Sequence, residues 1–187
     1  MSRIQVLASQ PRLALGALLT LLLAAGAVAG SGADFTASSA NPSNTFASGT
    51  LSIVNSKEGV AVLTAAGLKP AGAPATGTVD IENSGDLDGT FTLSRTAPVD
   101  SDAVNPLSAK LNVTVVDCGE FDGGAPACEG SDPELYDGTL AAMGSTALGA
   151  YAGGEKHRYE VTVALDGSAG NAYQGDSSQV QFDFDAA

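Results

Sequence analysis

The sequence predicts an all-β protein, an antiparallel β-sandwich or jelly roll that follows an N-terminal signal peptide. Seven segments alternate apolar with polar residues, a pattern typical of strands with one buried and one solvated face. Gly, Pro, Asn and Asp residues between these segments favour turns. After the N-terminal apolar run, no segment has the periodicity of an amphipathic helix. Together these observations indicate one antiparallel β-domain.

Two short strands are expected first, at residues 49–55 and 59–65. In the first, Leu51 and Ile53 fall on one face. The second alternates in the same way around Val62. Small or hydroxylated residues occupy many of the other positions, so each segment predicts a half-buried strand.

Two clearer strands follow at residues 77–85 and 89–95. Acidic residues alternate with apolar ones in the first, and Thr and Ser do so in the second. The sequence "DLDG" at residues 86–89 predicts a hairpin turn between the two strands, because a calcium loop needs further acidic ligands. The side chains expected in the core are Val79, Ile81, Phe91 and Leu93.

Three more strands are expected at residues 110–118, 157–165 and 177–186. Between the first two, residues 131–152 are less regular and predict a short strand or a small helix near residues 140–147. The core positions of these three strands are Leu111, Val113, Val115, Tyr159, Val161, Val163, Leu165, Val180, Phe182 and Phe184.

The N-terminus has the features of a signal peptide. Arg3 and Arg12 form a basic flank, and residues 13–29 carry no charge and are rich in Leu. Small residues follow, so cleavage fits after Ala29 or after Ala33. The chain is therefore expected to be secreted, with a signal peptide at residues 1–33, an N-terminal segment at 34–47 and a β-domain at 48–187.

The mature chain is strongly acidic. All 21 acidic residues follow the expected cleavage sites, whereas six of the eight basic residues do, so the net charge falls from −13 to −15. This charge disfavours binding to nucleic acid and to anionic membranes. It could attract divalent cations, and acidic loops such as "VDSD" at residues 99–102 allow weak calcium binding, although solvated charge explains them as well.

The two cysteines, Cys118 and Cys128, bracket a turn-forming stretch. In an exported protein, such a close pair predicts a disulfide across a peripheral loop. Closing a loop of this size contributes about 3 kcal/mol in the chain-entropy description.

No catalytic or metal-binding motif is apparent. His157 is the only histidine, so a zinc peptidase motif with two histidines one helical turn apart is absent. Strand alternation would place Glu155 and His157 on one face, which allows a weak metal contact, but an ordinary strand-edge histidine explains the pattern more simply. We expect no catalytic residue, no bound metal and no cofactor, which favours a structural or adhesive protein over an enzyme.

Three stretches together resemble the TasA/camelysin (CalY) family of secreted bacterial proteins. They are "TFASGTLSI" at residues 45–53, "LKPAGAPATGTVDIENSGDLDGTF" at 68–91 and "NAYQGDSSQVQFDFDA" at 171–186. The match covers about a third of the mature domain and excludes residues 100–153. The best-known member forms protein fibres of the biofilm matrix.

The resemblance implies a jelly-roll domain that a dedicated signal peptidase releases and that polymerises head to tail, alone or with an accessory matrix protein. In such fibres the N-terminal segment of one subunit fills a groove in the next. Residues 34–47 would be the donor strand, with Phe35 and Phe46 as its anchors. The name camelysin implies a second reading, a secreted metalloendopeptidase. A sugar- or ligand-binding module is a third possibility.

Overall fold

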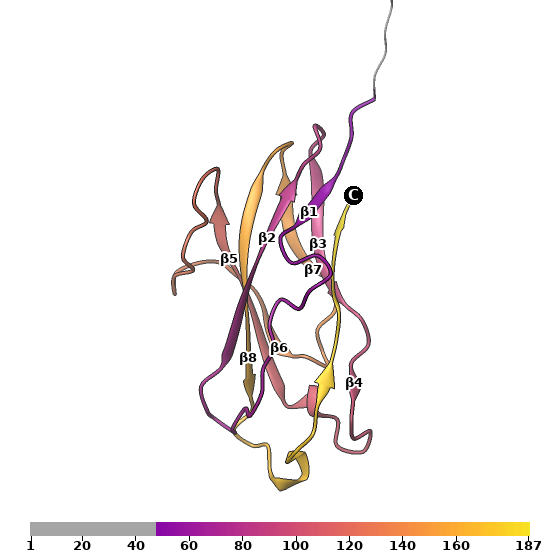
Figure 1. The fold of residues 1–187 in the computed structure, drawn as a ribbon, viewed down its shortest axis with the longest axis vertical. Helices are drawn as coiled ribbons and strands as arrows, with labels where there is room; N and C mark the ends of the chain where they lie inside the picture. The colour runs from indigo at the N-terminus through magenta and orange to yellow at the C-terminus, as the bar shows by residue number, and fades with distance from the viewer. Residues whose placement is uncertain (1–47) are drawn as a thin grey trace, which may run out of the picture. The chain divides into compact units, whose positions relative to one another are not determined.

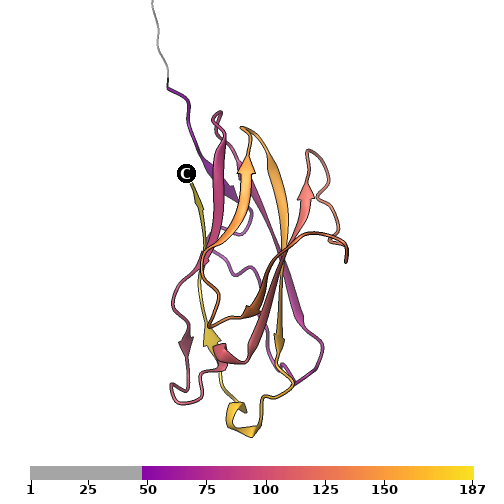
Figure 2. The same cartoon turned by 180° about the vertical axis from the view of Figure 1, so that it is seen from behind.

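The computed structural model describes residues 48–187, and antiparallel strands are the main secondary structure of this region (Figures 1 and 2). The predicted all-β class is therefore confirmed. The expected signal peptide and the segment 34–47 lie outside the described residues. In chain order the strands are β1 (Ile53–Asn55), β2 (Ala75–Asn83), β3 (Gly89–Arg95), β4 (Val99–Asp100), β5 (Leu111–Glu120), β6 (Glu134–Thr139), β7 (Thr146–Tyr151), β8 (Lys156–Leu165), β9 (Ser178–Gln179) and β10 (Phe182–Ala186), with short 3-10 helices η1 (Leu107–Ala109) and η2 (Asn171–Tyr173).

The strands form two main antiparallel sheets that share one core. The larger sheet has the order β1-β2-β8-β5-β6, and the smaller has the order β10-β3-β7. A two-stranded ribbon of β4 and β9 lies beside them. The central strands show the expected alternation of buried and less buried side chains. In β2, β3, β5 and β8, every second side chain is buried over much of the strand.

The core lies between the two main sheets. Both sheets contribute fully buried side chains, and aromatic residues from β3, β7 and β8 are among the largest of them. Phe91 and Tyr151 stack with ring centroids 4.2 Å apart. The buried hydrophobic cluster consists of Val79, Ile81, Phe91, Leu93, Leu111, Val113, Val115, Leu140, Met143, Leu148, Tyr151, Tyr159, Val161 and Val163.

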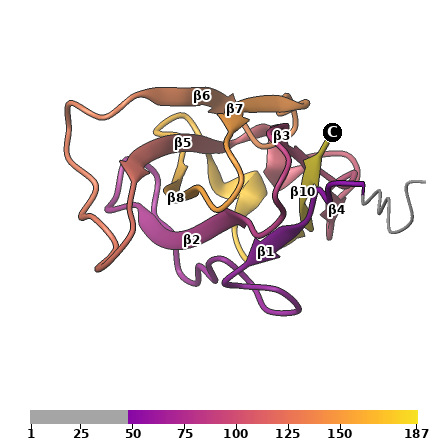
Figure 3. The same cartoon turned by 90° about the horizontal axis from the view of Figure 1, so that it is seen from above.

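The two sides of this sandwich differ (Figure 3). On one side, the edge strands β6 and β7 are neighbours and close the space between the sheets. On the other side, the edge strands are β1 and β10, and β1 is only three residues long. Consequently, β1 covers only one end of this side, at Ile81–Asn83 of β2.

Two strand predictions and one turn prediction were wrong. Residues 59–65 form no strand, because Gly59 turns the chain with a φ of 72° and Val60 faces solvent. The expected strand at 177–186 is divided, since β9 pairs with β4 whereas β10 pairs with β3. Residues 86–89 do not form a hairpin turn, because β2 and β3 belong to different sheets.

The less regular region contains two strands, β6 and β7, and a turn between them rather than a helix. Within residues 48–187, no helix is long and apolar enough to span a membrane.

Candidate functional site

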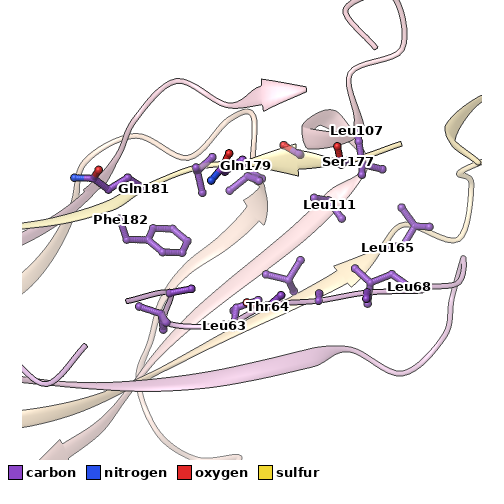
Figure 4. Close-up of a pocket in the computed structure, with 18 of the residues that line it drawn as sticks. Leu63, Thr64, Leu68, Leu107, Leu111, Leu165, Ser177, Gln179, Gln181 and Phe182 are labelled. Atoms are coloured by element: carbon purple, nitrogen blue, oxygen red, sulfur yellow. The ribbon is translucent and has the colours of Figure 1, made fainter. Parts of the chain in front are cut away.

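A long groove opens on the β1–β10 side of the sandwich, where β1 does not reach (Figure 4). Its volume is about 1440 Å³. One end, the near end, lies at Ile53 and Asn55 of β1, and the other, the far end, lies at η2 and Asp176. The apolar side chains that line it come from distant parts of the chain: Ile53, Val62, Leu63, Leu68, Leu107, Leu111, Leu140, Val163, Leu165, Val180, Phe182 and Phe184.

Most of these apolar side chains are only partly covered, although they pack against the core. Leu63 and Phe182 face each other across the groove, one from the loop after β1 and the other from β10 (Figure 4). Burying a large apolar side chain from full exposure contributes about 2 kcal/mol, and covering the exposed part of these side chains contributes a fraction of that. An apolar occupant of the groove would therefore stabilise the domain.

One wall of the groove is the outer edge of β10. Thr90 and Ala187 exchange two backbone hydrogen bonds, of 2.8 and 3.0 Å. Because such pairs alternate along antiparallel strands, the backbone groups of Phe182, Phe184 and Ala186 are directed away from β3. Within residues 48–187, no strand pairs with this second edge of β10. An added strand could bond to it, as edge strands readily do.

The opposite wall is the loop between β1 and β2. This loop packs closely on β2, because a β-carbon at Gly77 would overlap the carbonyl oxygen of Val62. The close approach brings Val62 and Leu63 to the groove. The pattern at residues 59–65 thus reflects a groove wall rather than a strand.

Acidic residues surround the groove, whereas few basic residues do. Glu58, Asp176, Asp183 and Asp185 line it, together with Lys57. The groove therefore suits a polar or apolar segment with little negative charge, because like charges would repel.

Both expected anchors, Phe35 and Phe46, lie outside the described residues. The structure accordingly shows the groove but not the segment expected to fill it. Sequence reasoning did not identify the groove residues as a site, since each of them reads as an ordinary core position of its own strand or loop.

His157 is not a strand-edge histidine, as β8 is a central strand and this side chain faces the interior. Its Nδ1 lies 3.1 Å from the carboxylate oxygens of Asp117, and its Nε2 lies 2.8 Å from Oε1 of Glu155. The ring also packs on Tyr151 at 4.7 Å between centroids. Nearby, the hydroxyl groups of Tyr151 and Tyr159 are hydrogen-bonded to each other.

This arrangement favours the protonated imidazole, which alone has a donor on each nitrogen. Burial opposes the charge, but the hydrogen bonds to Asp117 and Glu155 outweigh it and raise the pKa of His157 above 6.5. Burial likewise opposes the Glu155 carboxylate, but hydrogen bonds from Ala152 and His157 lower its pKa. Both ring nitrogens of His157 are therefore hydrogen-bonded to carboxylates. Within residues 48–187, no three His, Cys, Asp or Glu side chains are arranged to hold a metal ion.

The His157 cluster predicts a pH-dependent stability. A raised folded pKa means that the stabilisation is complete below about pH 6.5 and is lost as pH rises through the folded value. The lowered pKa of Glu155 means that this carboxylate stabilises the fold at neutral pH. That stabilisation is lost only at acidic pH, as the carboxylate becomes protonated. We expect His157→Gln to destabilise the protein by about 1–3 kcal/mol at pH 6 and by less at pH 9. Urea unfolding at both pH values measures this, and an equal loss at the two would contradict it.

Cys118 and Cys128 are joined in a disulfide, with Cα atoms 4.6 Å apart. The bond ties the end of β5 to a loop that projects from the sheet, as Figure 2 shows. Phe121 in this loop lies 5.7 Å from the Lys156 ammonium group, and Arg158 donates to the Pro126 carbonyl oxygen at 3.5 Å. These two contacts connect the loop to side chains of β8, and its residues do not line the groove.

The acidic loop at residues 99–102 is organised by its own hydrogen bonds. Asp100 accepts from the backbone and hydroxyl of Ser108, and Asp102 accepts from Val104 and Asn105. These bonds explain the two carboxylates without an ion, and calcium binding stays a prediction.

The comparisons with known proteins add no identity. No protein-family model matches the chain, and no curated protein is similar to it.

Proposed function

We propose that this chain is a secreted structural subunit that polymerises into extracellular fibres, with residues 34–47 of one copy filling the groove of the next. The observation that carries the proposal is the groove itself, an apolar channel whose wall includes the unpaired edge of β10 among residues 48–187. The jelly-roll topology and the biofilm-matrix setting belong to the proposal through the family resemblance. The disulfide is compatible with secretion.

The composition of residues 34–47 suits this groove. The segment has one charged side chain, at Asp34, and is otherwise polar or small apart from Phe35, Pro42 and Phe46. It can therefore approach the acidic rim with little repulsion, and its two Phe side chains can occupy the apolar lining. Its length of 14 residues exceeds that of a typical strand, about five or six.

The direction of the donor strand follows from where the described chain begins. Residue 47 is joined to Ser48, and the chain then runs directly into β1 at the near end of the groove (Figure 1). β10 runs toward this end, because Ala187 pairs with Thr90 beside Leu51. The donor would insert with its free N-terminal end first. If it enters the next copy at the far end, its direction from residue 34 to residue 47 is opposite to that of β10. All copies then have the same orientation, so the contact repeats without closing and gives a filament.

A fibre assay tests the proposal. The mature chain at tens of micromolar is expected to form filaments visible by electron microscopy and to sediment in the ultracentrifuge. Because the charge of −15 opposes close contact, the sedimenting fraction should rise with salt, with calcium or near pH 5. A chain that stays monomeric under all of these conditions would contradict the proposal.

The partners remain proposals as well: further copies of the same chain, a signal peptidase and an accessory matrix protein. The metalloendopeptidase reading gains no support from residues 48–187, which contain no suitable ligand group.

A further inference from the structure

The chain is clamped just before β1. The turn Ser84–Gly89 holds residues 49–52, and we call this contact the exit clamp. Thr50 donates from its backbone N–H and its hydroxyl to Oδ1 of Asp86, the second at 3.1 Å. Its carbonyl oxygen accepts from the backbone of Asp86 at 2.9 Å and of Leu87 at 3.1 Å. Ser84 donates to the Ser52 carbonyl oxygen at 2.9 Å.

Glycines make this close contact possible. A β-carbon at Gly85 would overlap the Thr50 carbonyl oxygen, and one at Gly49 would overlap the Leu87 side chain. Gly89 likewise leaves room for Leu51. The hydrogen bonds with Thr50 also lower the pKa of the Asp86 carboxyl, so this group stays ionised in mild acid.

The turn itself is held in place by a buried residue. Asn83 is fully buried, and its side-chain nitrogen donates to the carbonyl oxygens of Leu87 at 2.7 Å and Ala152 at 3.2 Å. Its side-chain oxygen accepts from the Gly85 backbone at 3.1 Å. The clamp is therefore built on a fixed frame rather than on a free loop.

A tethered strand creates a competition that an assembling chain has to resolve. A segment joined to its own domain by a short flexible linker has an effective concentration in the millimolar range. A second copy in solution at micromolar concentration is far more dilute. Without a geometric restriction, each chain would therefore fill its own groove, and the result would be a closed monomer.

We infer that the exit clamp provides this restriction. By holding residues 49–52 against the 84–89 turn, it prevents a chain from placing its own N-terminal segment in its own groove. The segment then binds in the groove of another copy. This inference rests on the proposed function. Self-filling would require the chain to reverse before β1. A reversal directly before β1 would fall within residues 49–52, whose backbone groups the clamp engages, and the returning strand would meet β1, which contacts β10 at the near end.

Two pairs of variants of the mature chain test the inference. Gly85→Ala displaces Thr50, and Gly144→Ala is its control, because a β-carbon at Gly144 meets nothing within 4 Å. Asp86→Ala removes an exposed carboxylate of the clamp, and Asp88→Ala is the control with the same charge change in the same turn. We expect Gly85→Ala to lower the sedimenting fibre fraction at least tenfold, Asp86→Ala to lower it less, and both controls to assemble like the natural sequence.

A peptide assay then asks whether the groove of the monomeric variant is filled. The probe is a fluorescent synthetic peptide of residues 34–47. A chain without residues 34–47 should bind it, whereas the Gly85→Ala monomer should bind it at least tenfold more weakly because its own segment competes. Fibres of Gly85→Ala in normal amount, or a Gly85→Ala monomer that binds the peptide like the truncated chain, would overturn the inference. A truncated chain that binds no peptide would instead contradict the proposed function.

Discussion

Deletion of residues 34–47 is expected to leave a folded, soluble monomer that forms no fibres. A donated strand adds several backbone hydrogen bonds to β10, each contributing roughly 1 kcal/mol net. Burial of Phe35 and Phe46 adds about 2 kcal/mol apiece. These gains have to exceed an association cost of about 4–15 kcal/mol, so their removal abolishes assembly rather than weakening it. Electron microscopy and sedimentation at matched concentration and salt measure the loss.

The fold should survive this deletion, because the described core consists of residues from β2 to β8. Circular dichroism and the urea midpoint should therefore match those of the intact chain in its monomeric form. A useful control replaces residues 34–47 with a Gly-Ser segment of the same length, which keeps the tail but removes both Phe anchors. This control should also fail to assemble. If either chain forms the same fibres as the intact one, the strand-donation mechanism is wrong.

The central sheets could be predicted from the sequence because their burial is periodic. Val79, Ile81 and Phe91 alternate with polar residues and are buried in the structure. The same rule failed at residues 59–65, where Val60 and Val62 alternate with Ala61 and Leu63, but Gly59 turns the chain and Val60 faces solvent. Alternation within one segment indicates that its apolar side chains are buried, but it does not indicate whether they lie in a paired strand or in the wall of a groove.

The candidate site could not be predicted, because its walls are far apart in the chain. Leu63, Leu107 and Phe182 come from a loop, a 3-10 helix and a strand, and only the sheet order shows that they share an open side. In the His157 cluster, strand alternation placed Glu155 on the same face as His157, but Asp117 was missed because it is 40 residues away. The disulfide was easier to anticipate, because its two cysteines are separated by 10 positions.

The acidic surface and the polar N-terminal segment gain a common explanation in the proposed fibre. A net charge of −15 keeps separate chains apart, and the repulsion is screened beyond about 10 Å at 0.1 M salt. A donor strand with a single charge can still enter a groove at close range. Charge would then control when the chains meet, whereas the groove would determine how they bind.

Phe182→Glu is expected to abolish fibre formation while leaving the donor segment intact. The substitution removes an apolar contact and places a carboxylate in the groove, where a bound strand would exclude water from it. The fold should tolerate the change, because Phe182 is half-buried and its cross-strand neighbour is Arg95. Gln181→Glu is the matched control. Gln181 borders the groove, but its exposed side chain points away from it in Figure 4, so this variant should assemble normally.

Mixing two inactive chains gives the most demanding test of the mechanism. Phe182→Glu has a donor but a blocked groove, and the chain without residues 34–47 has an open groove but no donor. Strand donation requires them to bind each other once and then stop, because neither free end of the pair can be extended. Sedimentation velocity should therefore show a 1:1 dimer and no fibres. If the two chains do not bind each other, or if Phe182→Glu alone forms fibres, the N-terminal strand does not bind in the groove.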